Sequence, residues 1–196
     1  MKKLISLILT FSLLMCVSCS SEEAEQSRES EETSAVEESE VVESIDETTV
    51  DVPSGFDPDF TFTTTDRSGV TYDETVFAQN KLTMINFWEP WCGPCVQEMP
   101  ELEELYENYA DQGFLIIGVY ATEGVESDVD EVLESTGVTY PILTYTSEFD
   151  QFQSGFVPTS ILVDSEGHII EVEGDTMIVG ANDYAGWEEL VTSHLG

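Results

Sequence analysis

The chain has 196 residues, of which 41 are Asp or Glu and only 5 are Lys or Arg, so its formal net charge is −36 at pH 7. A surface of this sign repels nucleic acid, which argues against a nucleic-acid-binding protein. The length suits one domain of ordinary size with additional terminal segments.

Residues 1–18 have the features of an export signal. Two lysines precede an apolar stretch, Leu4 to Val17, that is short for a membrane-spanning helix. The stretch ends in LLMCVSCS, which resembles a bacterial lipoprotein signal, where a cysteine after a small residue is lipidated. Cys19, which follows Ser18, fits this pattern better than Cys16. The prediction is an extracytoplasmic protein that is lipid-anchored to the bacterial cell membrane; a plain secretory signal cleaved nearby is the alternative.

Residues 19–55 are predicted to form an acidic, disordered linker. From Ser20 to about Pro53 the sequence is mainly Glu, Ser, Thr and Val, with no aromatic residue and Arg28 as its one cation. Such a segment cannot bury enough apolar surface to offset the entropy of ordering. Aromatic and aliphatic residues return from about Phe56 onward. We therefore expect the folded domain to span residues 56–196.

The first half of this domain alternates between strand and helix patterns. DFTFTTTDRSGVTYD, residues 59–73, alternates apolar and polar residues around a Ser68-Gly69 turn, which predicts a β-hairpin. The apolar run Leu82 to Trp88 predicts a buried strand. From Val96 to Tyr109 the apolar residues have helical spacing, and this helix should end near Gly113 and be kinked by Pro100.

The second half continues the alternation, which indicates an α/β fold. We expect strands at Phe114 to Tyr120 and within TYPILTY, residues 139–145, and helices at residues 126–135 and in SEFDQFQ, residues 147–153. TSILVDSEGHIIEVEG, residues 159–174, predicts two strands joined at Glu166-Gly167. A closing helix, Asn182 to Leu195, is predicted to be capped by Asn182.

The motif Cys92-Gly-Pro-Cys95 follows the buried strand directly and begins a helix. A cysteine at a helix N-terminus is stabilised as a thiolate by unpaired amides and by the helix dipole. We therefore predict that Cys92 is the nucleophile and that Cys95 resolves the mixed disulfide. Pro94 suits the first turn of the helix because it lacks an N–H. An oxidising compartment favours a disulfide between the two cysteines.

Other roles for the two cysteines fit less well. Structural zinc needs four ligands, but there is no second cysteine pair, and His168 and His194 are isolated in the sequence. Two inert cysteines in the core would also fit less well, because Trp-Cys-Gly-Pro-Cys after a buried strand is a specific signal for redox chemistry. A peroxidase would place Thr or Ser three residues before the attacking cysteine, where this chain has Glu89. We expect no metal and no organic cofactor, only a redox-active Cys92–Cys95 disulfide.

The segments INFWEPWCGPC, EMPEL and GFVPTSILVDSEGHII resemble the thioredoxin superfamily, and most closely its TlpA/ResA-like branch of extracytoplasmic thiol-disulfide oxidoreductases. The resemblance covers about residues 56–195. It implies a thioredoxin-like fold, with a central mixed β-sheet flanked by α-helices and an N-terminal β-hairpin extension. It also implies that Pro158 is a cis-proline facing Cys92, and that the backbone at Val157 pairs with an extended client strand. Trp91 is a further neighbour of the site.

Several positions depart from the pattern of the superfamily. Asn86 stands where thioredoxin has a buried Asp, so the usual proton acceptor for Cys95 is missing or replaced. Gly93 stands where some haem-maturation members have Glu, which weakens a dedicated role in cytochrome c maturation. Glu89 replaces a common Ala. It could raise the pKa of Cys92 or relay protons, but we interpret it as a solvated loop residue.

The resemblance implies a membrane-anchored oxidoreductase that reduces disulfides of client proteins. A disulfide-forming oxidase or isomerase is one alternative, and a non-catalytic adaptor with a vestigial cysteine pair is another. The implied partners are protein disulfide clients, a membrane electron donor of the CcdA or DsbD type, and the membrane itself through the lipid anchor. The strong acidity either keeps the protein solvated or attracts basic clients.

Overall fold

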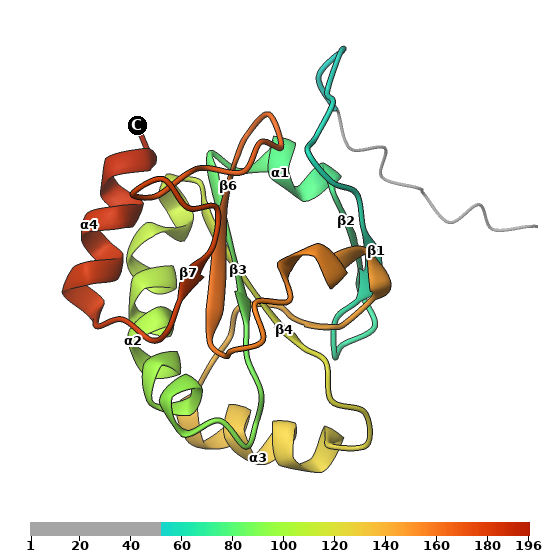
Figure 1. The fold of residues 1–196 in the computed structure, drawn as a ribbon, viewed down its shortest axis with the longest axis vertical. Helices are drawn as coiled ribbons and strands as arrows, with labels where there is room; N and C mark the ends of the chain where they lie inside the picture. The colour runs from blue at the N-terminus through green and yellow to red at the C-terminus, as the bar shows by residue number, and fades with distance from the viewer. Residues whose placement is uncertain (1–51) are drawn as a thin grey trace, which may run out of the picture. The chain divides into compact units, whose positions relative to one another are not determined.

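The computed structural model describes residues 52–196 (Figure 1). The predicted signal sequence, Cys19 and residues 19–51 of the predicted linker lie outside the described residues. In chain order the elements are β1 (Thr63–Thr65), β2 (Thr71–Asp73), α1 (Thr75–Gln79), β3 (Leu82–Phe87), α2 (Gly93–Tyr109), the 3₁₀-helix η1 (Ala110–Gln112), β4 (Phe114–Tyr120), α3 (Glu126–Thr136), β5 (Ile142–Thr144), the 3₁₀-helix η2 (Ser147–Phe152), β6 (Thr159–Asp164), β7 (Ile178–Val179) and α4 (Tyr184–His194).

A five-stranded mixed sheet in the order β5-β4-β3-β6-β7 forms the centre of the fold. Strand β3 pairs in parallel with β4 and antiparallel with β6. All six of its residues are buried, which explains why its sequence is an almost continuous apolar run. The predicted α/β fold with a central mixed sheet flanked by helices is confirmed.

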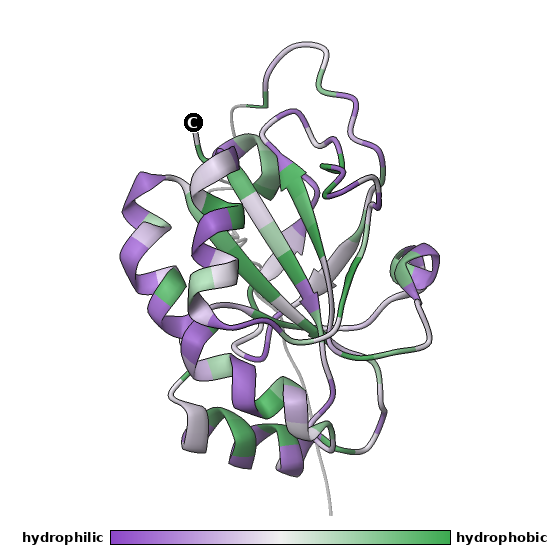
Figure 2. Cartoon of the chain, turned by 60° about the vertical axis from the view of Figure 1, so that its left-hand side comes forward, coloured by the Kyte–Doolittle hydropathy of each residue, from purple (hydrophilic) through white to green (hydrophobic). Residues whose placement is uncertain are grey.

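Alternate side chains of β3 enter two separate hydrophobic clusters. Leu82 and Met84 join a cluster with α2 and α4, which lie side by side against one face of the sheet. Ile85 and Phe87 join a second cluster on the other face, beneath the β1–β2 hairpin, α1 and η2. In Figure 2 the central strands are largely hydrophobic, whereas the helices carry hydrophilic stripes. This two-sided burial holds the carboxyl end of β3 in place.

The predicted N-terminal hairpin is present as β1 and β2, which pair antiparallel. The Asp66 carboxylate closes its turn by accepting hydrogen bonds from the backbone N–H groups of Ser68 and Val70. The hairpin packs through Phe60 and Phe62, whose rings contact those of neighbouring phenylalanines. Helix α1, which follows the hairpin, was not predicted because five residues are too few to establish a helical period.

The predicted turn at Glu166-Gly167 is present, but the strand expected after it is reduced to an isolated bridge between Ile169 and β6. Backbone hydrogen bonds join His168 and Ile170 to β6 on either side of this bridge. A tight turn at Glu173-Gly174, both with positive φ, then closes through reciprocal hydrogen bonds between Val172 and Asp175. After this turn, the short strand β7 pairs with the start of β6, at Thr159 and Ser160.

Two helix predictions also needed correction. The N-cap of α4 is Asp183, whose carboxylate accepts from the N–H of Gly186 at 2.9 Å, whereas the Asn182 side chain accepts from the N–H of Asp183. The predicted helix at residues 147–153 is the 3₁₀-helix η2. Among residues 52–196, no helix combines the length and the apolar character needed to cross a lipid bilayer.

Candidate redox site

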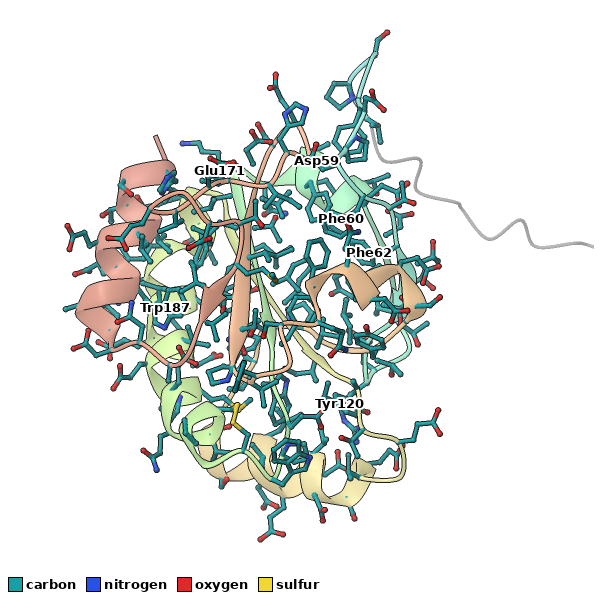
Figure 3. The ribbon with its side chains drawn as sticks, in the orientation of Figure 1. Asp59, Phe60, Phe62, Tyr120, Glu171 and Trp187 are labelled. Atoms are coloured by element: carbon teal, nitrogen blue, oxygen red, sulfur yellow. A yellow bond between two sulfur atoms is a disulfide. The ribbon has the colours of Figure 1, made fainter. Side chains whose placement is uncertain are left out.

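The two cysteines lie at the junction between the central strand β3 and helix α2. After β3 the chain turns, and the N–H of Cys92 donates to the carbonyl of Glu89 at 3.0 Å. Cys92 is the N-cap of α2, and Pro94 lies in the first turn. Cys92 and Cys95 form a disulfide, drawn in yellow at the start of this helix in Figure 3. The Cys92 Sγ also accepts from the N–H of Cys95 at 3.3 Å, so a helix amide points at the sulfur as the motif predicts.

The loop before β6 covers the disulfide from the opposite side. The peptide bond between Val157 and Pro158 is cis, as the resemblance implied. The carbonyl oxygen of Val157 lies 3.6 Å from the Cys92 Sγ. The loop is held by Ser154, whose hydroxyl accepts from the N–H of Phe156 at 3.1 Å. The backbone that is expected to pair with a client strand therefore borders the sulfur that would react with it.

Two exposed aromatic side chains flank this junction. Trp91, next to Cys92, is 68% exposed, and Phe156, next to Val157, is 72% exposed. The Trp91 indole N–H donates to the Thr122 hydroxyl at 3.5 Å, which links the motif to the loop after β4. Exposed aromatic residues close to a reactive centre are typical of a protein interaction surface.

Asn86 and Gly93 are two of the three positions at which the sequence departs from patterns within the superfamily. Asn86 is buried in β3, and its side-chain amide donates to the Ser160 hydroxyl on β6 at 3.0 Å. It therefore joins two strands, in line with its backbone register opposite Ser160. A Cβ on Gly93 would meet no atom within 4 Å, so packing does not require glycine there.

Glu89 is not the solvated loop residue that we expected. It is only 6% exposed, and its Oε1 accepts from the N–H groups of Ala121 at 3.0 Å and Thr122 at 3.1 Å. These amides lie just beyond the end of β4 and need an acceptor once the loop is buried. Its Oε2 is buried and has no hydrogen-bond partner among the described residues.

Glu98 is a second buried carboxylate near the motif, and the sequence reasoning missed it. It is 3% exposed, and its Oε1 accepts from the Trp187 indole N–H at 2.6 Å and from the N–H of Asn182 at 3.0 Å. Burial raises the pKa of Glu98 to about 7, and the two hydrogen bonds limit that rise. Cys95 and Glu98 share the inner face of α2, because residues three apart on a helix are neighbours. Its position on the apolar face of the predicted helix was the signal that could have found it.

Comparison with known proteins identifies a family and several relatives. Residues 54–186 match the Redoxin family. The thiol-disulfide oxidoreductase ResA of Geobacillus kaustophilus is 35% identical over 101 residues, which cover 50% of this chain and 58% of that protein. ResA of Bacillus subtilis is 31% identical over 101 residues, covering 50% of this chain and 56% of that protein. The chain thus spans a little over half the length of these curated relatives.

Solved structures share the fold. The crystal structure of a thiol:disulfide interchange protein from Chlorobium tepidum superposes with a TM-score of 0.61 at 25% sequence identity, covering 71% of this chain and 96% of that chain. The family match, residues 54–186, includes the cysteine pair and the sheet that positions it. The chain therefore belongs to the Redoxin family, and it is similar to the ResA thiol-disulfide oxidoreductases and to this thioredoxin-family structure.

Proposed function

We propose that this protein is an extracytoplasmic thiol-disulfide oxidoreductase that reduces disulfides of client proteins through Cys92 and Cys95. One observation carries the proposal: the disulfide lies at the N-terminus of α2, with the Cys95 N–H at 3.3 Å and the Val157 carbonyl at 3.6 Å from the Cys92 Sγ. The helix amide would stabilise a Cys92 thiolate, and the Val157 backbone would hold an extended client strand beside it.

The exchange is balanced within the cysteine pair. The Cys92 thiolate attacks one sulfur of the client disulfide, forms a mixed disulfide and releases one client thiolate. The Cys95 thiolate then attacks the Cys92 sulfur, which forms the Cys92–Cys95 disulfide and releases the second client thiolate. Two electrons pass to the client, so a membrane thiol-disulfide carrier of the CcdA or DsbD type is the proposed donor that restores the dithiol. No organic cofactor or metal is required.

Glu98 is the proposed acceptor for the proton of Cys95. Asn86 occupies the position of the buried Asp of thioredoxin and cannot accept a proton, whereas the buried carboxylate of Glu98 shares a helix face with Cys95. With its pKa raised to about 7, it can take up a proton from the Cys95 thiol near neutral pH. Glu98 would thereby favour the Cys95 thiolate that resolves the mixed disulfide.

The proposed location is the outer face of the bacterial cell membrane, with the lipid on Cys19. The Gly-Pro insert resembles that of reducing thioredoxins and favours a reductase. The alternative direction, an oxidase or isomerase of secreted proteins, uses the same residues with reversed electron flow.

The equilibrium reduction potential of the Cys92–Cys95 couple in the mature chain tests the direction. A value near or below about −250 mV would support a reductase, whereas about −120 to −180 mV would mean that the chain forms or rearranges disulfides. Cys92→Ser should abolish exchange, and Cys95→Ser should accumulate the mixed disulfide with clients. Client binding and cellular phenotype that survive Cys92→Ser would identify an adaptor instead.

A further inference from the structure

A small cavity lies beside the loop that covers the disulfide. Its volume is about 40 Å³. The residues lining it include Glu89, Tyr145, Phe152, Ser154, Phe156 and Val157. Val157 also contacts the reacting sulfur, because its carbonyl oxygen lies 3.6 Å from the Cys92 Sγ. A client strand that pairs with Val157 would pass over the mouth of the cavity.

One polar feature distinguishes this cavity from an ordinary packing gap. Glu89 is only 6% exposed. Of its two carboxylate oxygens, only Oε1 accepts hydrogen bonds, from the backbone N–H groups of Ala121 and Thr122. Its Oε2 has no partner among residues 52–196. A buried carboxylate oxygen without a donor is costly, which indicates that a donor from outside completes the arrangement.

No cationic side chain among residues 52–196 supplies that donor. The only Lys and Arg residues in this range are Arg67 and Lys81, and neither lines the cavity. Arg67 is bonded to Asp130 and to the Tyr120 hydroxyl, whose ring is labelled in Figure 3. Because the whole chain has a net charge of −36, its field also favours cationic partners.

We propose that this cavity receives a lysine side chain of the client, close in sequence to the client cysteine that Cys92 attacks. The ammonium group would donate to the Glu89 Oε2, and the alkyl stem would lie against Phe156, which is 72% exposed at the mouth. A cavity of about 40 Å³ exceeds the roughly 10–15 Å³ that one water molecule needs on the same measure, so it has room for an ammonium group. Because only Oε2 is free, the site suits a compact ammonium better than a guanidinium, whose planar fork pairs with both carboxylate oxygens. This inference rests on the proposed function and names its substrate class.

Peptide disulfides that differ at one position test the proposal. Each peptide contains one cysteine, linked as a mixed disulfide to a small thiol, with either lysine or its uncharged isostere norleucine at one of the three positions on either side. The reduced mature chain attacks each peptide, and kcat/KM is measured at about 0.15 M salt to screen long-range attraction. We expect lysine at one position to raise kcat/KM about tenfold or more over norleucine, the range of a charge-assisted hydrogen bond. Arginine at that position should gain less.

Variants of the protein identify the group that recognises lysine. Glu89→Gln keeps an acceptor for the two amides but removes the charge, and it should abolish the preference for lysine over norleucine. Glu107→Gln, an exposed carboxylate on α2, is the matched control and should retain that preference. Phe156→Ala, at an exposed position, should weaken the preference and serves if Glu89→Gln fails to fold.

The outcomes separate this inference from the proposed function. Reduction of all peptides without a preference for lysine would overturn the inference and leave the oxidoreductase intact. A preference that is equal at every position and survives Glu89→Gln would show that the overall field alone attracts lysine, which also overturns it. If no peptide of either series is attacked, the proposed function fails.

Discussion

Glu89 and Glu98 are two buried carboxylates on either side of the cysteine motif, and they differ in what can reach them. In both, Oε1 accepts two hydrogen bonds and Oε2 has no partner among the described residues. Glu98 lies in the core between α2 and α4, where it accepts from Trp187, which points from α4 toward α2 in Figure 3. Glu89 instead lines a cavity beside Val157. The same pattern of hydrogen bonds therefore accompanies two different proposed roles: Glu98 accepts a proton in the core, and Glu89 binds a client side chain at the cavity.

Replacing Glu98 by Ala is expected to cause the largest fall in the free energy of unfolding. Glu98→Ala would leave the Trp187 indole N–H and the Asn182 amide without their acceptor in the core, and would also create a cavity. We expect the free energy of unfolding to fall by about 4 kcal/mol, since each buried unsatisfied donor costs roughly 1–3 kcal/mol. Urea denaturation of the oxidised protein measures this. Glu98→Gln, which keeps an acceptor, should lose about 1 kcal/mol; equal losses in both variants would contradict the assignment.

A change of pH is expected to have a slightly smaller effect on the free energy of unfolding. The folded protein binds a proton at Glu98 more tightly than the unfolded chain, because the pKa of this group rises from 4.5 to about 7 on folding. Stability from this group is therefore present below about pH 4.5 and declines as pH rises through 7, by up to about 3 kcal/mol. Glu98→Gln should lack this component, so the stability advantage of the wild type over the variant should shrink from pH 5 to pH 8. Parallel pH curves for the two proteins would rule out the raised pKa.

The smallest of the three effects is expected at the edge of the fold. Glu89→Ala removes the acceptor for the amides of Ala121 and Thr122, but water can enter through the adjacent cavity and replace it in part. We expect a loss of about 1–2 kcal/mol in the free energy of unfolding, and faster hydrogen exchange at both amides. Glu89→Gln is the control that keeps most of the stability. A cost as large as that of Glu98→Ala would show that the two sites do not differ in access to water.

Local patterns were sufficient for much of the fold. The buried strand β3 follows from its apolar run, and the start of α2 at the cysteine motif follows from Pro94 and the helical spacing beyond it. The β1–β2 hairpin follows from alternation around a turn. These elements depend on residues that are neighbours in the chain, so their signals are contained in short windows.

Prediction was less successful where distant residues decided the outcome. The segment after β6 has strand-like alternation, but only its first residues, 168–170, bond to β6, and a tight turn follows at Glu173-Gly174. The strand that completes this edge of the sheet is β7, which pairs with Thr159 and Ser160. Likewise, Asn and Asp are both favourable at the N-cap of a helix, so the sequence does not distinguish Asn182 from Asp183. In the structure the Asp183 carboxylate accepts from an N–H of α4, whereas the Asn182 side chain accepts from the N–H of Asp183.

The sequence by itself determined the chemistry of this protein: two cysteines behind a buried strand and at the start of a helix, within a pattern that resembles the TlpA/ResA-like branch. Only the tertiary structure decided the surroundings of its acids. The partners of Glu89 are 32 and 33 residues away along the chain, and those of Glu98 are 84 and 89 residues away. From a short stretch of sequence, a charged side chain is expected to be exposed to solvent. It becomes a buried hydrogen-bond acceptor only when the fold brings unpaired N–H groups close to it.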